Sequence, residues 1–277
     1  MVGASLVIIA AAAREAAAVR RALRVLRRGR FTEYEYVPTG QEGRWRYWQG
    51  EASGRSVAIV RGGLGSQACT EAAELAHLCF GPQAMVVLGF SGALRADLRP
   101  GTLIVAERTT PEGTDGPDLV TVAADAGMVR AAIAAGQAAG IPTACGTLVT
   151  VATLAATPQA KHALAASTGA VAVDMEAGAV AAVAARAGLR FLAAKIVFDA
   201  ADEPLHPALM EVVRPDGSPR LLRAARLAAR DPEARAALHW AGRRSRLAAS
   251  VLTRFCRAFL PMMGAGDPGT GDGGIVD

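Results

Sequence analysis

Short apolar runs alternate with longer alanine-rich segments along most of this chain. The runs are rich in valine and isoleucine and are bounded by glycine or proline, which is typical of buried strands. Several alanine-rich segments end at glycine, as helices commonly do. The expected strands are two within residues 44–63 and one each at residues 6–10, 84–90, 101–108, 146–153, 171–176 and 190–200. The expected helices are residues 14–27, 66–79, 124–139, 177–188, 218–230 and 232–259.

This alternation predicts an α/β fold, a three-layer α/β/α sandwich with a mixed central sheet. We expect one domain over residues 1–262, in which residues 208–262 form a helical C-terminal extension. The Gly/Asp-rich residues 263–277 are expected to form a disordered tail. Ligands of such folds bind at the carboxyl ends of the strands, so the polar residues that follow apolar runs are the candidates for chemistry.

Composition narrows the class of protein. Hydrophobic residues make up 52% of the 277 residues and aromatic residues only 5%, which favours a large core of helices packed closely on a sheet. The four cysteines and four histidines have no metal-ligand spacing, so we expect free thiols and no metal site. The uncharged stretch 131–160 is broken by Gly136, Gly140 and Pro142, which argues against a membrane-spanning helix. No basic segment precedes the first apolar run, so we expect a cytoplasmic protein without a signal peptide.

The net charge of +5 reflects arginines that crowd residues 14–30 and 214–257. An anionic partner explains this excess, and so does a coding bias that enriches arginine and alanine together. In the C-terminal segment, arginines fall on one side of the expected helices and apolar residues on the other. Ordinary surface helices and interfacial helices in peripheral contact with an anionic membrane both fit this pattern. We expect no nucleic-acid partner.

A glycine-rich loop at residues 62–68 lies between an expected strand and an expected helix. Gly63 and Gly65 would let backbone amides face an anion or a hydroxyl-rich group. The loop also matches the loose dinucleotide pattern G-x-G-x-x-A, but the acidic residue expected about 20 residues later is missing. A tight turn without a ligand is the remaining interpretation.

Two carboxylates, Asp174 and Glu176, flank Met175 at the end of an apolar run. Buried charges are costly unless they bind something, although one of the two acids could interact with the dipole of the following helix. Asp199 ends the apolar run 190–200 in the same way. Partial burial raises the pKa of a carboxyl group and prepares it to act as a general acid, while helix capping is the alternative role.

These segments together resemble the nucleoside phosphorylase and nucleosidase superfamily over roughly residues 5–205. The resemblance is carried by VDMEA from residue 173, FDAAD from residue 198, the G-x-G loop at residue 63, and GFSGAL from residue 89 before GTLIVAE. The sequence is similar to the branch of methylthioadenosine/adenosylhomocysteine nucleosidases. It looks closest to hopanoid-associated phosphorylases because of TPQAKHALAASTGAVAVDMEA and the Arg-rich C-terminus.

The resemblance implies cleavage of the N-glycosidic bond of a purine nucleoside, with adenosine, a 5′-substituted adenosine or adenosylhopane as candidate substrates. It implies that Asp199 protonates the purine N7 and that Glu15 polarises the attacking water. Glu176 would bind the ribose hydroxyls and Met175 would pack against the sugar. The other expected substrate-binding residues are Asp174, Gly63, Gly65, Phe90, Ser91, Gly92 and Phe198. No cofactor is implied beyond inorganic phosphate as a co-substrate, and a homodimer is expected.

The sequence departs from the family pattern at the site. Val87 and Phe90 stand where many purine phosphorylases have an Arg and a Ser that bind phosphate, which weakens phosphorolysis relative to hydrolysis without excluding it. Phe198 replaces a common Ser beside the acid at 199. These apolar replacements keep open a non-catalytic nucleoside-binding protein on the same fold. A nicotinamide-dependent oxidoreductase is the least favoured alternative.

Overall fold

A computed structural model describes residues 3–30, 45–112, 120–214 and 218–263 of the chain. The expected disordered tail from residue 264 onward lies outside these ranges. The strands are β1 (Leu6–Ala10), β2 (Arg24–Arg30), β3 (Arg46–Ala52), β4 (Arg55–Arg61), β5 (Ala84–Ala93), β6 (Leu103–Pro111), β7 (Val122–Ala123), β8 (Thr143–Thr150), β9 (Ala172–Asp174) and β10 (Arg190–Asp199). The helices are α1 (Ala13–Arg20), α2 (Ser66–Phe80), α3 (Ala126–Ala138), α4 (Pro158–Thr168), α5 (Ala177–Arg186), α6 (Ala208–Glu211), α7 (Leu221–Arg230) and α8 (Pro232–Met262).

The strands form one mixed sheet in the order β10-β6-β8-β9-β5-β1-β4-β3-β2, with β7 attached to β6. Strand β5 is the centre of this sheet, because it pairs in parallel with β1 and β10 and in antiparallel fashion with β9. The extra pairing of β10 with β5 closes one half of the sheet on itself. The expectation of a mixed central sheet is confirmed.

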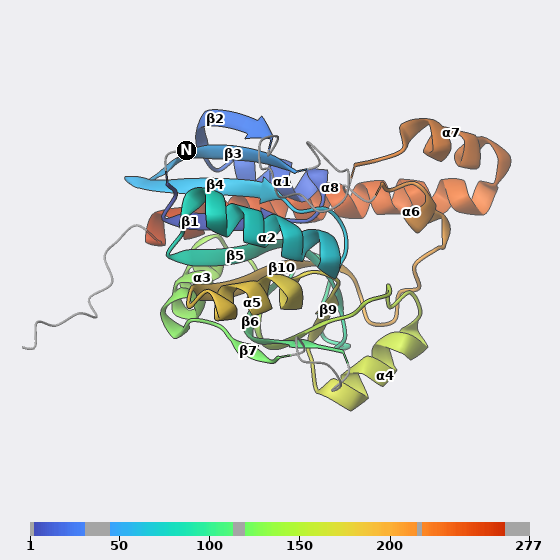
Figure 1. The fold of residues 1–277 in the computed structure, drawn as a ribbon. Coiled ribbons are helices and arrows are strands. Elements are labelled where there is room, and N and C mark those ends of the chain that lie inside the picture. The colour runs from blue at the N-terminus through green and yellow to red at the C-terminus, as the bar shows by residue number, and fades with distance from the viewer. Residues whose placement is uncertain (1–2, 31–44, 113–119, 215–217, 264–277) are drawn as a thin grey trace, which may run out of the picture.

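Two layers of helices cover the sheet (Figure 1). Helices α2 and α5 pack on one face and share a hydrophobic core with alternate residues of the strands. Helices α1, α3 and α8 pack on the other face and share a core with the remaining alternate residues. Because both faces are covered, the central strands are apolar without interruption, as the sequence pattern suggests. The three-layer α/β/α prediction is confirmed.

The C-terminal helices differ in their degree of burial. The second half of α8 belongs to the core, since Leu252, Phe255 and Phe259 are fully buried and the two phenylalanine rings stack with their centroids 5.1 Å apart. Helix α7 contains no buried residue and, with the first part of α8, projects from the body (Figure 1). None of the helices in the described ranges combines the length and the apolar character needed to cross a bilayer.

One sequence expectation about an element was wrong, and one helix was not expected. The helix expected at residues 14–27 ends at Arg20, and Arg24 begins β2, which pairs with β3. Sheet pairing overrides the helical preference of this arginine- and leucine-rich segment. Gly50 of β3 has no side chain, which lets the backbone of Arg24 approach this strand closely. Helix α4 was missed, although Thr157 caps it, a proline begins it and Gly169 ends it in the left-handed conformation.

Candidate active site

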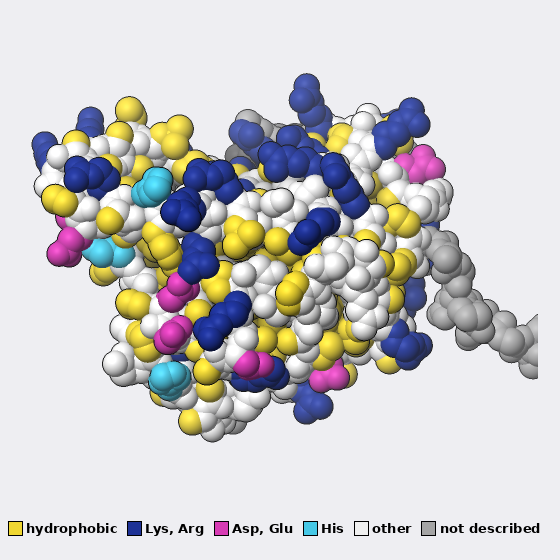
Figure 2. Space-filling view, turned by 180° about the vertical axis from the view of Figure 1, so that it is seen from behind, with side chains coloured by type: hydrophobic (Ala, Val, Ile, Leu, Met, Phe, Trp, Pro, Cys, Tyr) yellow, Lys and Arg dark blue, Asp and Glu magenta, His cyan; other side chains and the backbone are white. Residues whose placement is uncertain are grey.

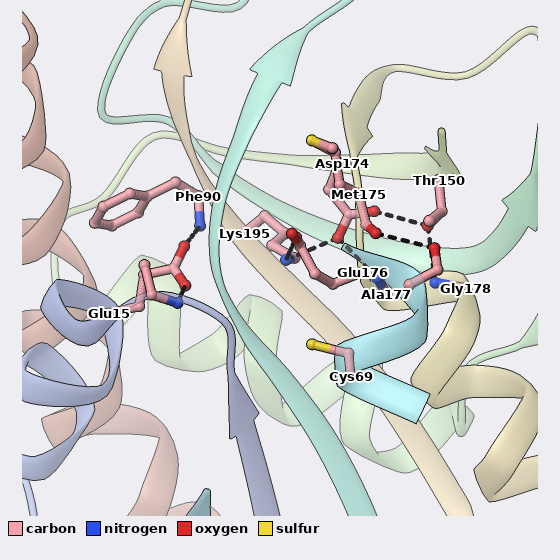
Figure 3. Close-up of polar contacts among 12 residues, drawn as sticks. Glu15, Cys69, Phe90, Thr150, Asp174, Met175, Glu176, Ala177, Gly178 and Lys195 are labelled. Carbon is pink, nitrogen blue, oxygen red and sulfur yellow. Dashed lines mark hydrogen bonds and ion pairs between the residues drawn. The ribbon is translucent and has the colours of Figure 1, made fainter. Parts of the chain in front are cut away.

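Glu15 lies in the first turn of α1 and is buried. Its Oε2 accepts a hydrogen bond from the backbone N–H of Ala12 at 2.8 Å, and its Oε1 accepts one from the N–H of Phe90 at 2.7 Å. These bonds join the turn after β1 to the end part of β5 (Figure 3). Burial raises the pKa of Glu15, and the charge of Lys195 opposes this rise. A Cβ at Gly89 would lie 2.5 Å from Oε1, so the glycine makes room for the carboxylate.

The carboxylate of Asp174 is held by an ion pair and two hydrogen bonds to neighbouring residues. Its Oδ2 lies 2.7 Å from Nζ of Lys195 and accepts the N–H of Ala177 at 3.0 Å. Its Oδ1 accepts the hydroxyl of Thr150 at 2.7 Å, and that hydroxyl accepts the N–H of Gly178 at 2.8 Å. The carboxylate therefore fixes Lys195 and the first turn of α5 (Figure 3). This geometry favours a positioning role for Asp174, whose expected contact with substrate stays a prediction.

Glu176 connects the glycine-rich loop to β10. Its Oε1 accepts the N–H of Gly65 at 3.1 Å, and its Oε2 lies 3.9 Å from Nζ of Lys195. The neighbouring carbonyl of Met175 accepts the hydroxyl of Ser66 at 3.1 Å. The amide at the start of α2 is thus occupied by a carboxylate of the protein, which disfavours a dinucleotide phosphate at this loop.

Glycine is required at two positions of this loop, because Gly63 and Gly65 have φ values of 91° and 86°. The carbonyl of Gly63 accepts the thiol of Cys69 at 3.3 Å. Burial and the nearby charge of Glu176 raise the pKa of that thiol well above its usual value. Cys69 is therefore a neutral thiol and not a nucleophile.

Acidic groups outnumber basic ones in the buried cluster formed by Glu15, Asp174, Glu176 and Lys195. Burial raises the pKa of Glu176 to about 7, with Lys195 opposing the rise and Asp174 adding to it. Burial disfavours the charge of Lys195, but the carboxylates of Asp174, Glu176 and Glu15 together raise its pKa above the usual value. One ammonium group thus faces three buried carboxyl groups. Such a site attracts positive charge that develops on a bound molecule.

Asp199 ends β10 and is also paired with a buried lysine. Nζ of Lys161, on α4, lies 2.5 Å from Oδ2 of Asp199 and donates to the carbonyls of Ala200 and Glu203 at 2.7 and 2.8 Å. Burial raises the pKa of Asp199, and Lys161 opposes the rise. Gly92 of β5 faces this carboxylate, because a Cβ there would lie 3.2 Å from Oδ2.

Aromatic side chains lie beside Asp199. The rings of Phe90 and Phe198 stack with their centroids 6.2 Å apart, and Phe198 meets Trp240 of α8 edge to face at 5.5 Å. Ser91, next to Phe90, is buried, and its hydroxyl has no hydrogen-bond partner among the described residues. A buried hydroxyl without a partner is a natural contact for a polar ligand atom.

The structure brings most of the expected residues to the carboxyl ends of β5 and β10, in two groups. One group contains Glu15, the loop with Gly63 and Gly65, and the segment 174–176. The other contains Gly92, Phe198 and Asp199. Phe90 connects the groups, through its amide to the first and through its ring to the second.

Sequence reasoning missed the two lysines. Lys161 and Lys195 are the only lysines among 30 basic residues, and their side chains are 0% and 1% exposed. In a chain whose surface cations are arginines, an isolated lysine inside an apolar segment was the signal that could have identified both. Compact ammonium groups fit beside buried carboxylates where a guanidinium would be too large.

Comparison with known proteins agrees with the geometry. Residues 5–230 match the family described as "Phosphorylase superfamily". No curated protein sequence matches the chain. Three solved structures have similar folds. The 5′-methylthioadenosine/S-adenosylhomocysteine nucleosidase of Helicobacter pylori has a TM-score of 0.69 and 17% identity, with 94% of this chain and 98% of that chain covered. The corresponding nucleosidase of Neisseria meningitidis has a TM-score of 0.69 and 18% identity, with 92% and 98% covered, and the futalosine hydrolase of Helicobacter pylori has a TM-score of 0.68 and 17% identity, with 92% and 96% covered.

The family match covers far more than half of the chain and includes both groups of site residues. The order of VDMEA and FDAAD, the three-layer fold and this match all agree. The chain therefore belongs to the phosphorylase superfamily and is an enzyme of the nucleoside phosphorylase and nucleosidase class.

Proposed function

We propose that this enzyme hydrolyses the N-glycosidic bond of a purine nucleoside, with a 5′-substituted adenosine as its substrate. The observation that carries the proposal is the excess of buried carboxyl groups, Glu15, Asp174 and Glu176, around the single ammonium of Lys195. The sugar gains positive, oxocarbenium-like charge as the bond to the base breaks, and buried carboxylates stabilise that charge.

The roles of the side chains follow from this chemistry. Asp199 donates a proton to N7 of the purine, which makes the base a better leaving group. Glu176 accepts hydrogen bonds from the ribose hydroxyls, and Met175 packs against the sugar. Glu15, held by two backbone amides, accepts a proton from the attacking water. Burial raises the pKa of both carboxyl groups, which favours the protonated form of Asp199 as the donor and makes Glu15 a stronger base for the water proton.

Electrostatics favours water over phosphate as the acceptor. A phosphate dianion at this cluster would face three buried carboxyl groups and one lysine, and like charges in a buried site repel strongly. Water carries no such penalty. Base release is therefore expected at the same rate in buffers with and without inorganic phosphate, followed by the absorbance change of the released base.

The 5′ substituent is proposed from similar proteins. Two of the solved structures with this fold are named as nucleosidases for 5′-methylthioadenosine and S-adenosylhomocysteine, and a third as a futalosine hydrolase. Adenosylhopane remains a candidate from the sequence resemblance. Homodimerisation and a cytoplasmic location likewise remain predictions.

A nucleoside-binding protein without turnover is the second candidate. It is favoured by the ion pair of Asp199 with Lys161, because a carboxylate paired with an ammonium group is a poorer proton donor to a purine base. A titration with methylthioadenosine distinguishes the two candidate functions. Both predict that the nucleoside binds, but only the enzyme is expected to release adenine.

Replacing Lys161 by Met is expected to shift the pH dependence of kcat. The Lys161 ammonium lowers the pKa of Asp199, so its removal raises that pKa further. With protonated Asp199 as the acid, the loss of activity at high pH is expected to move to higher pH in this variant. The profile is measured by base release under saturating substrate. The exposed neighbour provides the control His162→Ala, and an unshifted profile in Lys161→Met would contradict the role given to Asp199.

A further inference from the structure

Five exposed arginines line a groove of about 700 Å³ between α1 and α8. None of the side chains that contact substrate in the proposed mechanism lines it. Small side chains of both helices, including Ala17, Ala249 and Ser250, line the groove together with the arginines. The arginines are Arg14 and Arg21 of α1 and Arg246, Arg254 and Arg257 of α8.

Packing fixes the direction of this basic face. Arg246, Arg254 and Arg257 are spaced by eight and three residues, which places them on one side of α8. The other side of α8 carries Leu252 and Phe255, which are fully buried against the sheet. The arginines therefore cannot turn inward while the core is intact. Figure 2 shows Lys and Arg side chains gathered over this face of the molecule.

The positive charge of the groove is not neutralised within the described part of the chain. None of the residues lining it is acidic, and none of the five arginines forms an ion pair with a described residue. Elsewhere on the surface, arginines do pair with acids, as in Arg95 with Asp97 and Arg223 with Glu211. A cluster of like charges without counter-charges attracts an anionic partner.

An apolar strip lies at the edge of the same groove. Leu221 and Leu222 are 72% and 79% exposed, and they fall with the exposed Ala225 and Ala229 on an arc of about 100° of α7. Pro219 lines the groove and is two residues from Leu221, so α7 begins near the groove. Contact with a nucleic acid backbone does not stabilise exposed leucines, whereas their transfer from water into hydrocarbon lowers the free energy.

We propose that the surface formed by α1, α7 and α8 docks the protein on an anionic lipid bilayer. The arginines of the groove bind headgroup phosphates, and Leu221 and Leu222 enter the boundary between headgroups and acyl chains. The combination of basic groove and apolar strip distinguishes this partner from a soluble anion, which would engage the arginines alone.

The test is flotation of the full-length protein with phosphatidylcholine vesicles, with and without phosphatidylglycerol. We expect binding only to the anionic vesicles, and less of it at high salt. The pair Arg254→Glu and Arg257→Glu should weaken partitioning by at least about 30-fold, since each arginine lost removes about fivefold and each added glutamate is repelled by the anionic surface. The pair Leu221→Ser and Leu222→Ser should also weaken it, while both pairs keep wild-type turnover of a soluble nucleoside.

The matched control is Arg108→Glu with Arg130→Glu, which changes the net charge equally at exposed positions outside the groove. It should bind vesicles as the wild type does. Equal loss in this control would show attraction by net charge only and would overturn the proposal. So would failure of the wild type to bind anionic vesicles at low salt, an unchanged leucine pair, or tighter binding to duplex DNA than to the vesicles.

Discussion

Replacing Asp199 by Asn is expected to lower kcat for base release by a factor of roughly 10² to 10⁴. The amide has nearly the same shape as the acid but cannot donate a proton to N7. Lys161 keeps its two backbone acceptors, the carbonyls of Ala200 and Glu203, so the fold around position 199 should persist. The measurement is steady-state base release at saturating methylthioadenosine, with circular dichroism to check the fold.

The control for this variant is Asp202→Asn, an exposed acid three residues further along the chain. It makes the same substitution in the turn that follows β10 and should leave kcat unchanged. If Asp199→Asn released the base at near the wild-type rate, Asp199 would not be the general acid, and the proton would have to come from another group. If both variants lost activity equally, the effect would be one of overall charge.

Replacing Lys195 by Met is expected to lower the free energy of unfolding by about 3–5 kcal/mol at pH 8, because three buried carboxyl groups lose their only ammonium partner. The loss should shrink as the pH falls. Without the ammonium, the pKa of Glu176 rises above its value of about 7 in the wild type. The folded state then binds protons more tightly than the unfolded chain, so stability decreases as pH rises from about 4.5 toward that higher pKa.

Urea unfolding at pH 5 and pH 8 measures this difference. The double variant Lys195→Met, Asp174→Asn is the matched control, since it removes the closest opposite charge together with the lysine. It should recover a large part of the stability lost at pH 8. A Lys195→Met protein whose deficit is the same at both pH values, or whose deficit the second change deepens, would show that Lys195 acts through packing and not through charge.

Much of the fold could be predicted from the sequence, because the sequences of buried parallel strands are uninterrupted runs of apolar residues. The segments 84–90 and 190–200 were recognised in this way, and the acids that end such runs drew attention to Glu176 and Asp199. The ends of elements were less accurate. Strand β5 continues to Ala93 through Gly89 and Gly92, glycines that leave room for the carboxylates of Glu15 and Asp199.

The pairing of charges could not be predicted, because it depends on which strands become neighbours. Lys195 meets Asp174 only through the packing of β9, β5 and β10, and Lys161 meets Asp199 only because α4 lies over the end of β10. Their sequence separations give no hint of contact. The prediction of a helix at residues 14–27 was wrong for a similar reason, since the second half of this segment pairs with β3 as the edge strand β2.

We propose that this site breaks an N-glycosidic bond by hydrolysis, with its carboxylates stabilising positive charge on the sugar. The most direct test is to follow adenine release from methylthioadenosine by the purified protein in phosphate-free buffer, and then to add inorganic phosphate. We expect release of adenine and free methylthioribose at a rate that phosphate does not change. Release that strictly requires phosphate, with a sugar phosphate as product, would contradict it, as would tight binding of the nucleoside without any release.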